Sequence, residues 1–96
     1  MSTIVYEREM GITHRDYLRT VPSAVEGRTF TIRDGRVTIV DGQNQIDIEL
    51  GPERVRRIAS IKLPVTDVTY RFRGHTQEEA DAVMARFELY YRRGGG

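Results

Sequence analysis

Residues 29–49 read TFTIRDGRVTIVDGQNQIDIE, and this stretch decides the fold. Asp34-Gly35 is a strong signal for a two-residue hairpin turn, and a second turn falls within residues 41–44. Closing both turns brings apolar residues together: Ile32 with Val37, Phe30 with Ile39, Ile39 with Ile46, and Val37 with Ile48. A slip of one residue would move this whole set to the other face, so the register is strongly specified. The stretch therefore predicts three consecutive antiparallel strands with one apolar face.

The opposite face of these three strands is polar, apart from one valine. It carries Thr29, Thr31, Arg33, Arg36, Thr38, Val40, Gln45, Asp47 and Glu49. Alternation of this kind is typical of an antiparallel sheet that packs one face on a core and leaves the other in water.

The sequence on either side extends the predicted sheet. Residues 66–73 alternate clearly and predict a further strand, and residues 3–6 are a candidate fifth strand. Residues 61–65 alternate around Pro64, and because proline is confined to sheet edges and bulges we expect an edge strand or an irregular crossing there. For residues 53–58 the pattern does not decide between a helical turn and the approach to a strand.

A short helix is predicted before the strands. It begins after Thr13, a capping residue that is followed three positions later by Asp16. Proline in a helix removes a backbone hydrogen bond and clashes with the preceding turn, so Pro22 leads us to expect an end near Thr20. A turn to Gly27 follows.

A second helix is predicted after the strands. Thr76 and Glu79 form a full capping box at its start. Its apolar stripe consists of Ala80, Val83, Met84, Phe87 and Tyr91, with Tyr90 at the margin. Such a stripe needs a sheet to cover it.

These elements predict an α+β fold. We expect a two-layer sandwich, in which an antiparallel meander of about four or five strands carries a short N-terminal helix and a C-terminal helix on one face. A chain of 96 residues can bury one modest core, so we expect a single domain over residues 1–93 and a flexible glycine tail at 94–96.

Composition excludes several chemistries and favours a solvated surface of mixed charge. The net charge is only +1, and no cysteine is present to form a disulfide, a thiolate metal site or a thiol nucleophile. No run resembles a targeting or membrane segment, so we expect a cytoplasmic protein without membrane contact. The preference for arginine over lysine is typical of a GC-rich, bacterial-like genome.

The reactive side chains are few and scattered. His14 and His75 each lie at a predicted helix start, and they would need to meet in space to begin a zinc or iron site. They are weak candidates, because neither has a second ligand at metal-binding spacing. No hydroxyl lies in a glycine-flanked elbow and no glycine run forms a phosphate cradle, so we expect no cofactor and favour a protein that is not an enzyme.

Arginine clusters supply the candidate binding residues. They are Arg33 and Arg36 around the first hairpin turn, Arg54, Arg56 and Arg57 before residues 61–65, and Arg71 and Arg73 on one face of the strand at 66–73. Arginines in a stripe can grip phosphates, but single-strand binders add aromatic platforms to the same face. Here the aromatic residues of the strands map to the apolar side.

The last five residues, Arg92-Arg93-Gly94-Gly95-Gly96, resemble the basic residues and terminal diglycine of ubiquitin-like proteins and small sulfur carriers. The resemblance implies a carrier that is modified at its C-terminal glycine. Those families adopt a β-grasp fold in which the tail follows a strand, whereas here it follows the predicted final helix. We therefore favour a flexible C-terminal end.

Together these features favour a small binding or assembly domain that acts without catalysis. Its contacts with a protein partner, or with a second copy in a homodimer, would use the Thr/Arg sheet face or an exposed edge strand near Pro64. Tyr90 is added as a binding residue because tyrosine is favoured at interfaces. Nucleic-acid binding through the arginines is the first alternative, and a glycine-tail carrier is the second.

Overall fold

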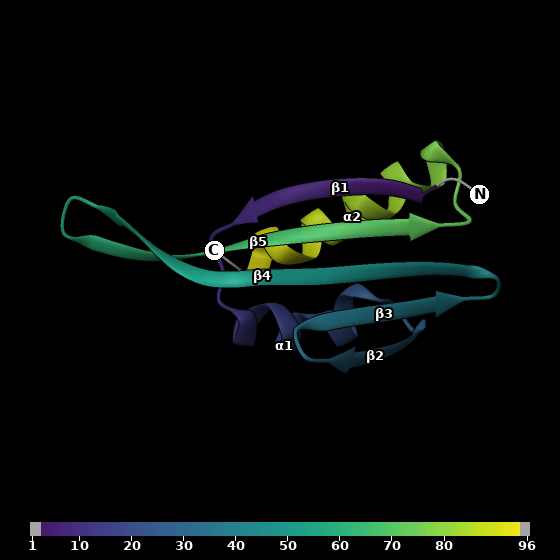
Figure 1. The fold of residues 1–96 in the computed structure, drawn as a ribbon, viewed down its shortest axis with the longest axis horizontal. Helices are drawn as coiled ribbons and strands as arrows, with labels where there is room; N and C mark the ends of the chain where they lie inside the picture. Colours follow the sequence, from purple (N-terminus) through teal and green to yellow (C-terminus); the bar gives the residue numbers. More distant parts are fainter. Residues whose placement is uncertain (1–2, 95–96) are drawn as a thin grey trace.

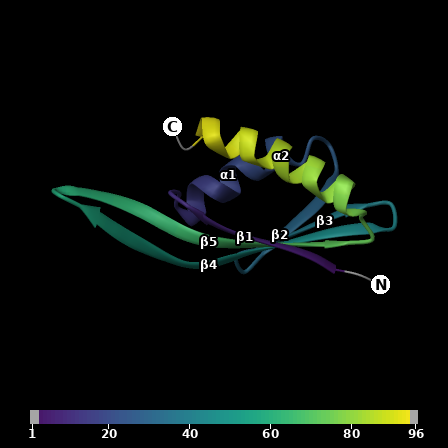
Figure 2. The ribbon, with the colours of Figure 1, turned by 90° about the horizontal axis from the view of Figure 1, so that it is seen from above.

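The computed structural model describes residues 3–94 and shows an α+β fold with one sheet and two helices (Figure 1). The elements in chain order are β1 (Thr3–Met10), α1 (His14–Ala24), β2 (Thr29–Arg33), β3 (Arg36–Asp41), β4 (Asn44–Ile58), β5 (Ile61–Arg73) and α2 (Gln77–Gly94). Both helices lie on one side of the sheet, as expected (Figure 2). The other side, called here the open face, is covered by no element of the described chain.

The sheet has five antiparallel strands in the order β1-β5-β4-β3-β2. The predicted register of residues 29–49 is confirmed, including the opposition of Ile39 to both Phe30 and Ile46. Asp34 and Gly35 have φ angles of 50° and 73°, the pattern of a type I′ turn. The run at residues 3–6 does form a strand, and it continues to Met10 as the edge beside β5.

Helix α1 begins as predicted, but the predicted end near Thr20 is wrong. The Thr13 side chain accepts a hydrogen bond from the Asp16 backbone N–H at 3.1 Å. The helix then passes through Pro22 to Ala24. Val21 and Ala24 are buried on either side of the proline, so packing against the core offsets the lost hydrogen bond.

Helix α2 has the predicted capping box in both directions. The Thr76 N–H donates to the Glu79 carboxylate at 2.8 Å, and the Glu79 N–H donates to the Thr76 hydroxyl at 3.1 Å. The apolar stripe is buried at Ala80, Met84, Phe87 and Tyr91, while Val83 and Tyr90 are partly buried. The predicted tail begins at the last residue of α2, and residues 95–96 lie outside the described part of the chain.

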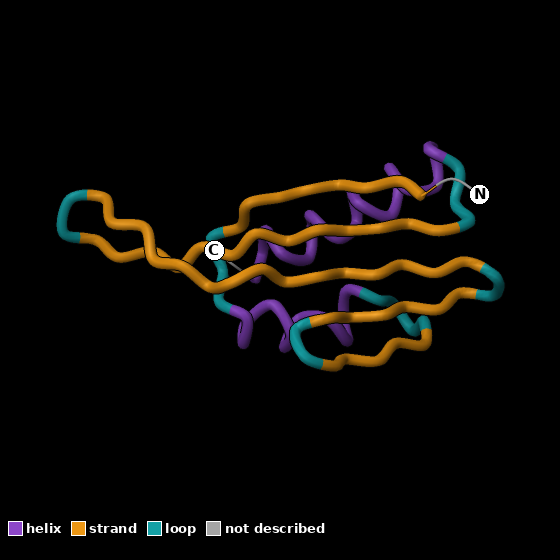
Figure 3. The backbone as a smooth tube through the Cα atoms, viewed as in Figure 1, coloured by secondary structure: helices purple, strands orange, loops and turns teal. Residues whose placement is uncertain are grey.

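Residues 52–65, called here the arm, include residues 53–58, for which the sequence pattern did not decide between a helical turn and a strand. Strands β4 and β5 continue past the body of the sheet as a two-stranded ribbon that projects from one end (Figure 3). Residues 53–58 are therefore strand and not helix. Pro64 lies opposite Val55 in a ribbon whose strands both have a free edge, which fits the expected edge strand.

The arm makes the molecule elongated, with extents of 47 × 24 × 22 Å. Neither described helix is long and apolar enough to cross a membrane. The cytoplasmic location stays a prediction.

Candidate functional site

The open face brings together four of the predicted arginines. Cross-strand pairing places Arg36 opposite both Arg33 and Glu49, and it places Arg71 and Arg73 opposite Asp47 and Gln45. Side chains directly opposite on antiparallel strands share a face. These four arginines therefore share one face of the sheet, whereas Arg54, Arg56 and Arg57 lie on the part of β4 beyond Leu50.

Acidic side chains interrupt the arginines on this face. Arg36 lies 2.5 Å from the Glu49 carboxylate, and Arg71 approaches the same carboxylate at 4.0 Å. Arg73 lies 3.3 Å from Asp47. The face is thus a mixture of paired charges, and no continuous positive stripe runs across it.

Arg33 is an exception among these arginines. Its cross-strand neighbour is Arg36, and no carboxylate within residues 3–94 forms an ion pair with it. The two arginines line an open concavity of about 650 Å³ together with Thr31, Ile32, Asp34 and Thr38. This hollow lies at the β2 edge of the sheet.

The arm carries the most unusual surface of the described chain, because aliphatic side chains on it face water. Val55 is 65% exposed, Ile58 53%, Ile61 58% and Leu63 41%. Ile58 lies opposite Ile61 at the tip and Leu63 opposite Arg56, so by alternation these three share one face of the ribbon, whereas Val55, opposite Pro64, lies on the other face. A lone exposed aliphatic residue is ordinary, whereas a group of four on one projecting ribbon is a feature typical of interaction surfaces.

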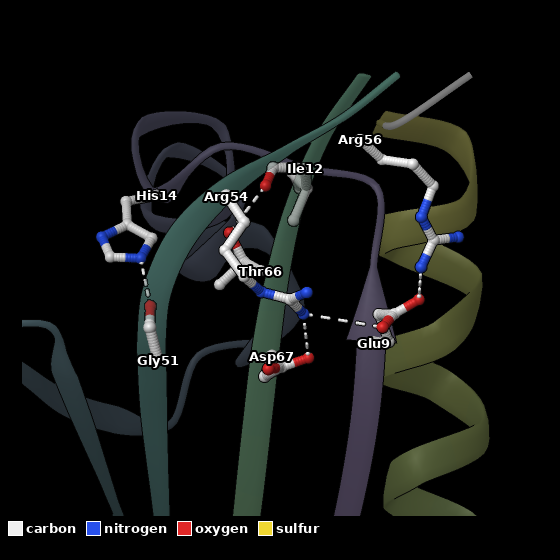
Figure 4. A network of polar contacts seen from close by, with 8 residues as sticks. All are labelled: Glu9, Ile12, His14, Gly51, Arg54, Arg56, Thr66 and Asp67. Atoms are coloured by element: carbon white, nitrogen blue, oxygen red, sulfur yellow. Dashed lines mark hydrogen bonds and ion pairs between the residues drawn. The ribbon is translucent and has the colours of Figure 1, made fainter. Parts of the chain in front are cut away.

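Charged residues fasten the base of the arm to the sheet. Arg54 lies 2.8 Å from Asp67 and 3.5 Å from Glu9, and Arg56 lies 2.5 Å from Glu9 (Figure 4). The hydrogen bond from Arg56, followed by its positive charge, lowers the pKa of Glu9. These contacts link β1, β4 and β5, so the two arginines serve the arm's attachment.

At the base of the arm, side chains also form hydrogen bonds with backbone groups. A ring nitrogen of His14 lies 2.6 Å from the Gly51 carbonyl, and the buried Thr66 hydroxyl donates to the Ile12 carbonyl at 2.8 Å (Figure 4). The backbone N–H of His14 donates to Glu53 at 2.8 Å. The register of β4 against β5 shifts between Leu50 and Glu53, where the arm begins.

The outer part of the arm is basic. Arg57 and Lys62 lie directly opposite each other, and neither forms an ion pair with a described carboxylate. Residues 52–65 hold four basic side chains and one carboxylate, a net charge of +3, against +1 for the whole chain. Like charges in opposition destabilise a strand pair, so the tip would gain from an anionic neighbour.

The two histidines do not meet. His14 lies beside Gly51 in the middle of β4, whereas His75 follows Arg73, which pairs with Gln45 near the start of that strand. Six residues of strand, about 20 Å, separate these positions. His75 instead packs its ring edge-on against Phe72. Within residues 3–94 no three metal-ligating side chains come together.

Tyr90 lies on the side of the sheet that the helices cover, away from the arginines of the open face. Its hydroxyl donates to the Glu26 carboxylate at 3.0 Å, and the guanidinium of Arg86 contacts the same carboxylate. The hydrogen bond from Arg86 lowers the pKa of Glu26 to about 2. Tyr90 thus helps to join the end of α1 to α2 and does not extend the arginine surface.

The hydroxyls of the buried tyrosines form hydrogen bonds inside the molecule. Tyr17 donates to the Tyr70 hydroxyl at 2.9 Å, and Tyr91 donates to the Tyr17 carbonyl at 3.1 Å. Burial raises the pKa of Tyr70 to about 12. These hydroxyls stay protonated at neutral pH and tie the two helices to the sheet.

Sequence reasoning missed the aliphatic residues of the arm, although a signal was present. If Ala59-Ser60 is taken as a two-residue turn, Ile58 falls opposite Ile61 and Val55 opposite Pro64, as the structure has them. The same pairing argument succeeded at Asp34-Gly35. Ala59-Ser60 lacks the Asn, Asp or Gly residues that two-residue hairpin turns prefer, and this concealed the hairpin.

Comparison with known proteins finds no family model that matches this chain and no similar curated protein.

Proposed function

We propose that this protein is a binding or assembly domain without catalytic activity, and that the arm is its main contact element for a protein partner. The observation that carries the proposal is the set of four aliphatic side chains, 41–65% exposed, on a ribbon that projects from the body. The Thr/Arg face beside the arm extends the contact surface.

In the free protein, the exposed aliphatic side chains of the arm contribute little stabilising free energy. Burying an aliphatic side chain of this size contributes about 1.5–3 kcal/mol, and the arm leaves much of that gain unused at four positions. A partner that covers the ribbon would recover it. The free edges of both arm strands also offer backbone groups for an added strand.

Charge defines the chemistry of the partner. Arg54 and Arg56 are paired with Asp67 and Glu9 of the body, so the unpaired positive charge of the arm is that of Arg57 and Lys62, and a surface that combines apolar side chains with carboxylates would complement it. Arg57 and Lys62 would then obtain the counter-charges that the described chain does not provide.

The test compares two aliphatic residues of similar exposure. Ile61 on the arm is 58% exposed, and Leu89 on α2 is 53% exposed, so Leu89→Ser is the matched control for Ile61→Ser. Wild type and both variants are immobilised, exposed to an extract of the source organism, and the bound proteins are quantified by mass spectrometry. We expect a partner that wild type and Leu89→Ser retain and that Ile61→Ser loses at least about tenfold.

Equal retention of every bound protein by the two variants would contradict the proposal. Circular dichroism and thermal unfolding of both variants establish that each is folded, so that a loss is assigned to the surface and not to misfolding.

Nucleic-acid binding is a second candidate function, and the unpaired Arg57 and Lys62 are the observation that favours it. The paired arginines of the open face weigh against it. A mobility-shift assay with random duplex and single-stranded oligonucleotides measures it directly. Binding that weakens steeply with salt and disappears in Arg57→Glu/Lys62→Glu would show that the arm binds a nucleic acid and not a protein partner.

A further inference from the structure

The outer edge of β2 is a second unpartnered feature, distinct from the arm. Strand β2 is last in the sheet order, so only β3 pairs with it. Its five residues, TFTIR, contain no proline and no charge before Arg33. By contrast, β1 at the opposite edge carries Glu7, Arg8 and Glu9. Charges and prolines are among the usual protections of an edge against pairing, and residues 29–32 of β2 have neither.

The hairpin turn determines which backbone groups of β2 face outward. In a type I′ hairpin the residues that flank the turn, here Arg33 and Arg36, exchange hydrogen bonds with each other. The bonding alternates along the strand, so Thr31 and Thr29 also bond to β3. Phe30 and Ile32 therefore direct their backbone N–H and C=O groups away from the sheet.

We infer that two copies of this chain pair through β2, antiparallel about a two-fold axis at Thr31, and join their sheets into one. In this register Phe30 faces Ile32 of the second copy, and their outward N–H and C=O groups bond. Ile32, which is 43% exposed in the single chain, gains an aromatic neighbour.

Charge selects this register over its neighbours. Centring on Thr31 places Arg28, which precedes β2 and lies 3.4 Å from Asp41 of its own chain, opposite Asp34 in the hairpin turn of the second copy, a pair of opposite sign. Centring on Ile32 would instead place Phe30 opposite Asp34, and centring on Phe30 would place Arg28 opposite Ile32, so neither register offers Arg28 a carboxylate. Opposite charges stabilise a cross-strand pair, whereas like charges destabilise it.

The dimer should be weak. Each strand contributes five residues, whereas a standard stable interface has roughly 20–30 residues per side. We therefore expect an equilibrium between monomer and dimer that depends on protein concentration and is measured by sedimentation equilibrium.

Single cysteines test the register, because the natural chain has none. Thr31 on the axis faces its own copy in a non-hydrogen-bonded pair, with a Cα separation of about 4.5 Å that suits a disulfide. Thr29, on the same face and edge, lies about 13 Å from its own copy in this register. Under mild oxidation we expect Thr31→Cys to form covalent dimers at least roughly tenfold faster than Thr29→Cys. Equal rates, or faster crosslinking at position 29, would overturn the inference.

A second pair of variants tests the outward hydrogen bonds. The N–H of Ile32 faces away from β3, so Ile32→Pro keeps the monomer's ladder and removes one intermolecular bond from each copy. Ile32→Thr removes the same aliphatic side chain but keeps the N–H. We expect Ile32→Pro to weaken dimerisation roughly 10- to 100-fold relative to Ile32→Thr. Equal dissociation constants would overturn the inference, and neither variant alters the arm.

Discussion

At the scale of single residues, the point where the arm leaves the sheet depends on a few polar contacts. Thr66 is fully buried and donates to the Ile12 carbonyl at 2.8 Å, although the two residues lie 54 positions apart. A buried carbonyl that loses its donor keeps the full cost of desolvation. Thr66 therefore holds the chain before α1 against the base of the arm.

Replacing Thr66 with valine preserves the shape of the side chain and removes the hydroxyl. We expect Thr66→Val to lower the free energy of unfolding by about 1–2 kcal/mol, measured by urea denaturation. Thr69→Val, on the open face of the same strand, is the control and should change it by less than about 0.5 kcal/mol. A loss of the same size at both positions would show that the Ile12 contact contributes nothing.

Glu26 couples the two helices in a way that depends on pH. Its pKa falls from 4.5 to about 2 because Arg86 and Tyr90 hydrogen-bond the carboxylate. A lowered pKa in the folded state means that the contribution is complete above about pH 4.5 and is lost as the pH falls toward about 2. The clamp between α1 and α2 is thus present at neutral pH.

We expect Glu26→Gln to unfold at a lower temperature than wild type at neutral pH, with the difference shrinking as the pH falls below 4.5. Glutamine occupies the same left-handed backbone position, φ 51°, so the backbone strain is unchanged. Glu7→Gln, which removes an exposed carboxylate on β1, is the control. Thermal unfolding across the acid range measures both, and a constant difference at every pH would contradict the assignment.

At the scale of elements, two prolines differ in whether the missing backbone N–H costs a hydrogen bond. Pro64 lies opposite Val55, three positions from the Ile58–Ile61 pair that flanks the Ala59-Ser60 turn. Alternation from that turn gives Pro64 an outward backbone nitrogen, so its missing N–H costs the ribbon nothing. Pro22 lies inside α1 and does remove a helical hydrogen bond, to the Leu18 carbonyl.

Replacing Pro22 with alanine should restore that bond. The helix gains a donor, while the unfolded chain gains some freedom, so we expect Pro22→Ala to stabilise the protein by about 2 kcal/mol in urea denaturation. Ser23→Ala, one position along on an exposed side, should change stability by less than about 0.5 kcal/mol. Destabilisation by Pro22→Ala would mean that the proline shapes the packing of Val21 and Ala24.

At the scale of the whole molecule, body and arm have different roles. The main core cluster lies between the helices and the five strands, outside residues 52–65. In the arm, Val65 at the base is buried, whereas Val55, Ile58, Ile61 and Leu63 are exposed. The body therefore holds the buried core, and the proposed function assigns the contact surface to the arm.

Shortening the arm tests this separation. Replacing residues 55–64 with Asn-Gly places a type I′ turn between Arg54 and Val65, a hydrogen-bonded pair by alternation from the tip, and keeps the Arg54–Asp67 ion pair. We expect one cooperative unfolding transition with a midpoint within about 4 °C of wild type in calorimetry. A broad transition, or a fall well beyond that range, would show that the arm contributes to the fold.

Much of the fold could be predicted because its signals are local. The hairpin at Asp34-Gly35 and the capping box at Thr76 each depend on residues a few positions apart. That register placed Arg33 and Arg36 on the open face, while Arg71 and Arg73 were placed together on one face of their own strand by alternation. Their pairing with acids could not be predicted so directly, because Arg73 and Asp47 meet only when β4 and β5 align.

By itself, the sequence determined the register of residues 29–49, both helix starts and the polar nature of the open face, because turns, caps and a two-residue period act over short distances. Only the tertiary structure decided that α1 passes Pro22, that His14 and His75 lie about six residues apart along β4, and that residues 52–65 project as an arm. These outcomes depend on burial and on contacts between distant segments. Such contacts contribute free energy only after the sheet and helices have packed, so no local pattern records them.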